Sequence, residues 1–227
     1  MTQPEPTRIL AVRHGETAWN VDTRIQGQLD VGLNDKGRWQ ALRVAAALAG
    51  EGLDVVYASD LARAFDTARA IGAATGLTVR PDPGLRERHF GVFEGKTWAE
   101  IETHWPRESA RWRARDLDFG PEGGETLQAF YARVVDAAER LAAAHPGQTV
   151  VLVAHGGVMD CLYRAAVRLD LAAPRTWQLG NAAVNRLLYT PEGFSLVGWS
   201  DTSHLDGLPH DEFSDGAADR AVTRDGA

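Results

Sequence analysis

Two features that define many small proteins are missing from this chain. It has a single cysteine, Cys161, so it cannot form an internal disulfide framework. It also lacks an apolar run of about 18 residues and the charged and apolar regions of a secretory signal. We therefore expect a soluble cytoplasmic protein that does not enter a membrane, with Cys161 buried on a helix.

Positive charge is also scarce. The chain has 24 Lys and Arg against 31 Asp and Glu, which gives a formal net charge of -7. Nucleic acids and anionic membrane surfaces are bound by clustered Lys and Arg over a large face. We expect neither partner, and any site for an anion must be local.

The length of 227 residues and the 44% of hydrophobic residues suit one domain with a substantial core. We predict a single domain over residues 1–227, with a lid insert at about 90–125 and a mobile tail at about 206–227. The protein is expected to be a monomer or a homodimer.

Apolar runs and helical patterns alternate along the chain, which is typical of βα units. The pattern predicts an α/β fold: a three-layer sandwich with a mostly parallel central sheet, helices on both faces and a helical lid insert. Ser59 and Asp60 are the expected cap of the second helix. The predicted strands are 9–12, 53–58, 77–80 and 149–154, with a hairpin at 184–190 and 194–200, and the predicted helices are 35–49, 61–75, 125–145 and 156–169.

Two of these strands end in the same dipeptide. His14-Gly15 follows the first strand, and His155-Gly156 follows the buried strand 149–154. Because parallel βα units bring the carboxyl ends of strands to one edge of a sheet, the two histidines are expected to face each other across a ligand site.

Five ordered motifs resemble those of the histidine phosphatase superfamily, the phosphoglycerate mutase-like proteins. The similarity extends over about residues 8–205. The motifs are Leu-Ala-Val-Arg-His-Gly-Glu-Thr at 10–17, Ser-Asp-Leu-Ala-Arg-Ala at 59–64 with Thr67-Ala68, Leu-Arg-Glu-Arg-His-Phe-Gly at 85–91 with Glu94-Gly95, Gly-Gly-Glu-Thr at 123–126, and Val-Ala-His-Gly-Gly at 153–157.

The resemblance implies that His14 is the nucleophile that takes up a phosphoryl group, and that Arg13, Arg63 and His155 surround its oxygens. The chemistry agrees, because guanidinium and imidazole donors stabilise the charge spread over those oxygens. Only a neutral imidazole can attack, so its other nitrogen should be held by a backbone carbonyl, for which Gly15 is the candidate.

Glu87 is the expected proton donor. The leaving alkoxide needs a proton in the first step and the attacking water loses one in the second, so one carboxyl group can serve twice. The competing interpretation is that Glu87 only pairs with a neighbouring arginine.

Further phosphate contacts are implied by the resemblance in the loop after the nucleophile, at Asn20 and Gln26, with Thr23 left open. Gly156 can offer a backbone N–H at a helix start, although its glycine also suits the tight turn. Arg88 is a candidate for gripping a substrate carboxylate.

Several functions remain open at this point. The favoured one is hydrolysis of a small phosphomonoester, with no metal and no cofactor. A cofactor-dependent phosphoglycerate mutase, primed by 2,3-bisphosphoglycerate, is the main alternative, and a non-catalytic phosphoryl-binding protein is a minor one. A metal-dependent hydrolase using His14, His155, Glu87 and His204 as ligands is disfavoured, because no metal-ligand spacing supports it.

The lid insert and the C-terminal region leave two questions. Trp98, Trp105 and Trp112 are expected to form the lid core rather than a substrate platform, and the arginines among them a solvated face. His204 either folds back toward the site or lies on the surface. Those lid arginines are Arg107, Arg111, Arg113 and Arg115.

Overall fold

The computed structural model describes residues 5–206, and its centre is a six-stranded sheet in the order β3-β2-β4-β1-β5-β6. The predicted tail lies outside the described residues except for Asp206, and the extent of the domain over the whole chain stays a prediction. The strands are β1 (Thr7–Arg13), β2 (Val55–Ala58), β3 (Val79–Pro81), β4 (Thr149–Ala154), β5 (Val184–Thr190) and β6 (Gly193–Asp201).

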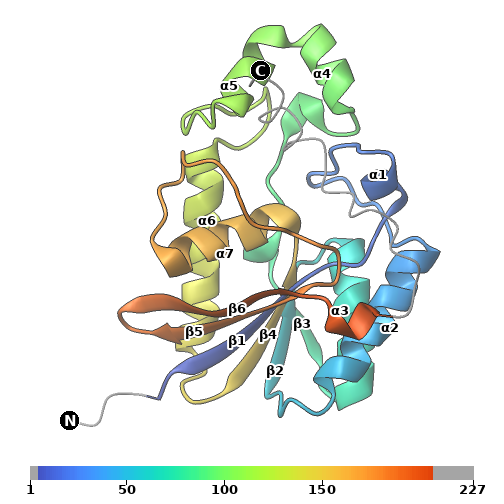
Figure 1. The fold of residues 1–227 in the computed structure, drawn as a ribbon, viewed down its shortest axis with the longest axis vertical. Coiled ribbons are helices and arrows are strands. Elements are labelled where there is room, and N and C mark those ends of the chain that lie inside the picture. The colour runs from blue at the N-terminus through green and yellow to red at the C-terminus, as the bar shows by residue number, and fades with distance from the viewer. Residues whose placement is uncertain (1–4, 207–227) are drawn as a thin grey trace.

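Helices cover both faces of the sheet, as Figure 1 shows. On one face α2 (Asp35–Leu48) and α3 (Ala62–Thr75) pack against the even-numbered side chains of β1, such as Leu10. On the other face α6 (Leu127–Ala143) and α7 (Gly156–Val167) pack against the odd-numbered ones, such as Ile9. The predicted three-layer α/β sandwich is confirmed.

The strands at the centre of the sheet are apolar because helices cover both of their faces. Every residue of β4 is buried, and β1 is buried except at Arg8. The first four strands are parallel to one another, whereas β5 and β6 form the predicted hairpin and run antiparallel. The sheet is therefore mostly parallel, with an antiparallel edge.

The helix ends differ from prediction in two places. The expected side-chain cap of α3 is wrong: its N-cap residue is Leu61, which makes no side-chain cap bond, and Asp30 from a distant loop accepts the Ala62 amide at 2.7 Å. Helix α6 starts at Leu127 rather than Glu125, because the Thr126 side chain accepts an amide of its first turn.

The lid insert has its own core. Helices α4 (Trp98–His104) and α5 (Pro106–Arg113) lie beyond the carboxyl ends of the strands (Figure 1). They follow the short 3-10 helices η1 (Pro83–Leu85) and η2 (Gly91–Phe93). The lid core is the buried set Phe93, Ile101 and Phe119, with Trp98, Trp105 and Trp112 packed against it.

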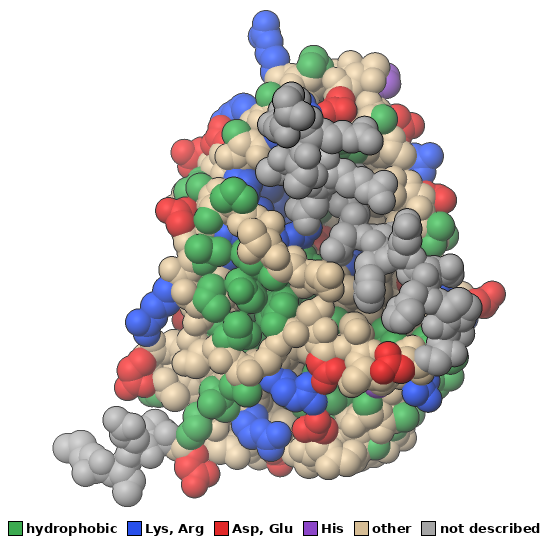
Figure 2. Space-filling model, viewed as in Figure 1, with side chains coloured by type: hydrophobic (Ala, Val, Ile, Leu, Met, Phe, Trp, Pro, Cys, Tyr) green, Lys and Arg blue, Asp and Glu red, His purple; other side chains and the backbone are tan. Residues whose placement is uncertain are grey.

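The outer face of α7 carries an aromatic cluster. Tyr163 stacks on Trp177 with ring centroids 4.0 Å apart and meets Trp199 of β6 edge-on at 4.8 Å. Figure 2 shows hydrophobic side chains gathered near this part of the molecule, with acidic and basic groups mixed along the margin. Cys161 is buried on α7, as predicted. No helix within residues 5–206 has the length and apolarity needed to span a membrane.

Candidate active site

A cavity opens between the carboxyl ends of the parallel strands and the lid. It is lined by seven of the nine residues predicted to form the site: Arg13, His14, Asn20, Gln26, Arg63, Glu87 and Gly156. The register explains why residues so far apart in sequence meet here, since Arg13 at the end of β1 lies opposite Ala154 at the end of β4. The residues that follow each strand, His14 and His155, are therefore neighbours.

His14 lies at the base of the cavity and is only 3% exposed. Its Nδ1 lies 2.7 Å from the Gly15 carbonyl oxygen, which can only accept a hydrogen bond, so Nδ1 carries the proton and Nε2 carries the lone pair. The predicted contact with Gly15 is confirmed. Burial, together with the charges of Arg63 and Arg13, holds the pKa of His14 well below its usual range, so the imidazole is neutral.

His155 is completely buried beside His14, with the two ring centroids 5.2 Å apart. Its Nε2 lies 2.8 Å from the hydroxyl oxygen of Ser59, which already accepts the Leu61 amide. The Ser59 hydroxyl can donate to Nε2, an arrangement that places the His155 proton on Nδ1, an atom with no hydrogen-bond partner in the described part of the chain. Burial, followed by the charge of Arg63, also lowers the pKa of His155 far below its usual range.

Two arginines bring positive charge to the cavity, and backbone carbonyls hold both of them. Arg63 on α3 donates to the carbonyls of Gly27 at 2.6 Å and Leu29 at 2.9 Å, and Arg13 donates to the carbonyl of Leu179. Burial lowers the pKa of Arg63 to about 10, so it stays charged at neutral pH. The two guanidinium groups supply the cavity with donors of the kind that bind the oxygens of a phosphate dianion.

The loop after the nucleophile is folded by its own polar side chains. Thr17 and Asn20 form a capping box at the start of α1 (Ala18–Val21), in which the Asn20 side-chain oxygen accepts the Thr17 amide at 3.0 Å. The hydroxyl of Thr17 also lies 3.0 Å from the side-chain oxygen of Gln26. These bonds occupy the side-chain oxygens and leave the NH₂ groups of Asn20 and Gln26 as the donors at the cavity wall.

Glu87 is held by backbone amides on both carboxylate oxygens. Oε1 accepts the Arg88 amide at 2.8 Å and Oε2 accepts the Gly157 amide at 2.9 Å. A side chain at Gly157 would displace the carboxyl group of Glu87, because a Cβ there would lie 2.2 Å from Oε1 of Glu87. Gly157 therefore has a structural reason to be glycine beyond the tight turn.

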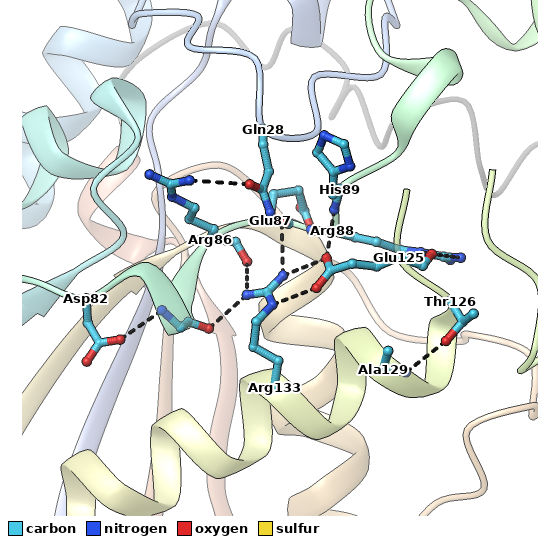
Figure 3. A network of polar contacts seen from close by, with 11 residues as sticks. Gln28, Asp82, Arg86, Glu87, Arg88, His89, Glu125, Thr126, Ala129 and Arg133 are labelled. Carbon is cyan, nitrogen blue, oxygen red and sulfur yellow. Dashed lines mark hydrogen bonds and ion pairs between the residues drawn. The ribbon is translucent and has the colours of Figure 1, made fainter. Parts of the chain in front are cut away.

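The loop that carries Glu87 is anchored to α6, as Figure 3 shows. Arg133 donates to the Glu87 carbonyl at 3.2 Å and pairs with both carboxylate oxygens of Glu125, at 2.7 and 2.8 Å. Glu125 in turn accepts the His89 amide at 2.8 Å. The carboxyl group of Glu87 is thus fixed by a network that is itself ion-paired.

Arg88 is not among the residues that line the cavity, and its assignment as a substrate-binding residue stays a prediction. It is 6% exposed, and its guanidinium donates to the carbonyls of Phe119 at 2.7 Å and Glu125 at 2.9 Å. Burial lowers its pKa to about 10. Backbone carbonyls of the lid segment therefore accept from Nε and Nη2 of Arg88.

Other predicted residues have mixed outcomes. Trp98 and Trp112 line the cavity as well as packing in the lid core, whereas Trp105 only packs. His204 is half-buried outside the cavity, and its Nε2 lies 3.0 Å from the Ala182 carbonyl. The Ala182 amide donates to the His14 carbonyl at 3.2 Å, so His204 supports the backbone of the nucleophile indirectly.

Three residues support the site in ways that were not predicted from the sequence. Ser59 binds His155, and the hydroxyl of Thr67 accepts the Gly15 amide at 3.1 Å. Asn181 donates to the His14 carbonyl at 3.0 Å. Ser59 and Thr67 belong to motifs that resemble the family, and this was the only available signal for them.

No group of three or more His, Cys, Asp or Glu side chains within residues 5–206 is arranged to hold a metal ion. The two histidines and Glu87 are directed instead to Ser59, Gly15 and backbone amides. The ligand set considered for a metal-dependent hydrolase is therefore not assembled among the described residues.

Comparison with known proteins places the chain in a family. The model of the histidine phosphatase superfamily (branch 1) matches residues 9–202. Phosphoglycerate mutase-like protein 4 of Arabidopsis thaliana is 41% identical, with 87% of this chain and 86% of that protein covered. Metal-independent phosphoserine phosphatase of the same plant is 38% identical, with 89% and 85% covered. A solved structure of mycobacterial glucosyl-3-phosphoglycerate phosphatase with VO3 has a TM-score of 0.77 at 38% identity, with 86% and 99% covered.

Proposed function

Because the chain belongs to the histidine phosphatase superfamily, we propose that it hydrolyses a small phosphomonoester through a phosphohistidine intermediate on His14. The observation that carries the proposal is the state of His14: a neutral imidazole that donates its Nδ1–H to the Gly15 carbonyl and keeps its lone pair on Nε2, at the base of a cavity lined by Arg13 and Arg63. Such a group is an activated nucleophile beside a ready-made anion site.

In the first step the His14 Nε2 lone pair attacks phosphorus, and the bond from phosphorus to the leaving oxygen breaks. Glu87 gives its proton to that oxygen. Arg13, Arg63 and the Nδ1–H of His155 stabilise the charge on the three remaining oxygens. In the second step water attacks the phosphohistidine, Glu87 takes the water proton, and His14 leaves as the neutral imidazole.

Hydrolysis is favoured over phosphoglycerate mutase activity, which remains the second candidate. Both share the phosphohistidine and differ in whether water or a bound monophosphate accepts the phosphoryl group. The names of the relatives include phosphatases for phosphoserine and for glucosyl-3-phosphoglycerate as well as a mutase-like protein. The position of Arg88 argues for hydrolysis, because Arg88 does not line the cavity and its Nε and Nη2 donate to the carbonyls of Phe119 and Glu125.

The substrate is a small phosphorylated metabolite, and the reaction needs neither a metal nor a cofactor. A relative named as metal-independent supports this. A purely phosphoryl-binding role is disfavoured, because the nucleophile, both arginines and the carboxyl group are all present. The cytoplasmic location and the choice between monomer and homodimer stay predictions.

The test measures phosphate release from phosphoserine, 3-phosphoglycerate and phenyl phosphate, with and without chelator. We expect chelator-insensitive release by the wild type and its loss in His14→Ala, together with loss of the acid-labile phosphoryl-enzyme. His145→Ala is the matched control, because His145 bonds Tyr57 and Gln148 at the other end of β4. Undiminished release by His14→Ala contradicts the proposal. Interconversion of 2- and 3-phosphoglycerate that far exceeds phosphate release would favour the mutase.

A further inference from the structure

Four aromatic side chains line the cavity together with His14. Trp98 and Trp112 reach it from the lid, Phe90 from the lid base and Trp19 from α1. All four are partly exposed. They line the same cavity as His14, so they are within reach of the leaving group of a phosphomonoester bound there.

The lid core does not account for this exposure. Its fully buried members are Phe93 and Ile101, and Trp105 packs on Phe93 with ring centroids 5.5 Å apart without reaching the cavity. Trp98 and Trp112 instead keep indole surface at the cavity, and apolar surface left in water is stabilised when a ligand covers it. The two tryptophans therefore combine a packing role with an open face.

The aromatic wall that these side chains form is also rigid. Trp112 stacks on Phe90 with centroids 4.8 Å apart and an interplanar angle of 15°, and Trp98 meets Trp112 edge-on at 5.9 Å. The Arg88 guanidinium lies 5.5 Å from the centroids of both Phe90 and Trp112. Because backbone carbonyls fix Arg88, its position gives the two rings a firm support. A preordered surface of this kind binds with little loss of side-chain entropy.

We propose that this wall, defined by Trp19, Phe90, Trp98 and Trp112, is a leaving-group subsite that selects phosphomonoesters carrying a ring. The flat face of an aromatic ring and the apolar C–H face of a sugar ring are both complementary to an indole surface. The inference rests on the proposed phosphatase function and specifies the substrate class of the same site. Small open-chain phosphomonoesters are then poorer substrates than ring-bearing ones.

The test compares substrates whose leaving groups are all primary alcohols, so that differences in leaving-group basicity are small. They are ethyl phosphate, 2-phenylethyl phosphate and 2-(glucosyloxy)ethyl phosphate. For the wild type we expect a higher kcat/KM with at least one ring-bearing substrate than with ethyl phosphate. The phenyl and glucosyl arms show whether an aromatic ring or a sugar is preferred.

Substitutions then locate the subsite. Trp112→Leu should lower the ratio of kcat/KM for ring-bearing to ethyl phosphate by about threefold to tenfold, the range expected for one lost ring contact. Trp105→Leu is the matched control and should leave this ratio at the wild-type value. Trp19 lies outside the lid, so Trp19→Leu tests the aromatic wall independently if Trp112→Leu disturbs the fold of the lid.

Each other outcome overturns the inference. One such outcome is a wild-type ratio of kcat/KM for ring-bearing to ethyl phosphate near one. A second is a ratio that stays at the wild-type value in both Trp112→Leu and Trp19→Leu. A third is a ratio that falls as much in Trp105→Leu as in Trp112→Leu. The proposed function fails separately, by the absence of phosphate release from every substrate, and the subsite proposal fails with it.

Discussion

At the scale of single residues, the geometry around Glu87 leads to a test of its role as acid and base. Glu87→Gln keeps the size of the side chain and removes the proton donor. We expect kcat for alkyl phosphates to fall about 100-fold or more, the usual contribution of general acid catalysis. For phenyl phosphate, kcat should fall much less, because phenolate needs less protonation to leave. Steady-state rates with ethyl and phenyl phosphate measure the difference.

A second variant separates the position of the carboxyl group from its presence. In Gly157→Ala the new methyl group displaces the end of the Glu87 side chain, since the Cβ would lie 2.2 Å from Oε1. It should reproduce the selective loss on alkyl phosphates while Glu87 itself is intact. Glu122→Gln, at an exposed lid position, serves as the control. Equal losses on both substrate types in Glu87→Gln would count against the acid role.

What could be predicted for single residues followed from chemical necessity. A nucleophilic imidazole needs its second nitrogen held, and the carbonyl of Gly15, the next residue, holds it. The direction in which the Arg88 guanidinium points could not be predicted, because it depends on the carbonyls of Phe119 and Glu125, more than thirty residues away. The role of Ser59 was hidden for the same reason: its partner, His155, is 96 positions along the chain.

At the scale of elements, hydrophobic patterns located the strands and helices well. The strand 149–154 was predicted with its observed bounds, and the final hairpin within a residue or two, because buried strands are continuous apolar runs. The cap of α3 was mispredicted for a physical reason. Local sequence offers Ser59 and Asp60, but Ser59 accepts the amide of Leu61, the residue before the helix, and Asp60 pairs with Arg86 at 2.5 Å. Asp30 replaces them from another loop.

This long-range cap can be tested by substitution. Asp30→Ala removes the acceptor of the Ala62 amide, and we expect a loss of about 1 kcal/mol in the free energy of unfolding, as for other N-cap side chains. Asp30→Asn keeps an acceptor oxygen and should lose less. Urea unfolding followed by circular dichroism measures both. The same stability for Asp30→Ala and wild type would mean that water replaces the carboxylate without cost.

At the scale of the whole molecule, the site determines how stability depends on pH. His14 and His155 are buried and neutral, and both pKa values lie well below the usual value, which is about 6.5 in the unfolded chain. Below that pH the unfolded state takes up protons that the native state does not bind. The contribution of the two neutral histidines to the free energy of unfolding is therefore fully present above about pH 6.5 and is lost as the pH falls. A site built for a dianion thus makes the fold sensitive to acid.

The size of this effect can be measured separately from that of the carboxylates. As the pH falls from 7.5 to 5.5, we expect each of the two histidines to lower the free energy of unfolding by about 1 kcal/mol. The reason is that the unfolded state binds up to one more proton per histidine than the native state. The paired carboxylates, such as Asp60 and Glu125, have lowered pKa values and lose their contribution only at more acidic pH. His14→Ala removes one titrating group, so its loss between the two pH values should be about 1 kcal/mol smaller than that of the wild type. Urea unfolding at both pH values tests this, and an equal pH dependence of the two proteins would show that His14 is not held neutral.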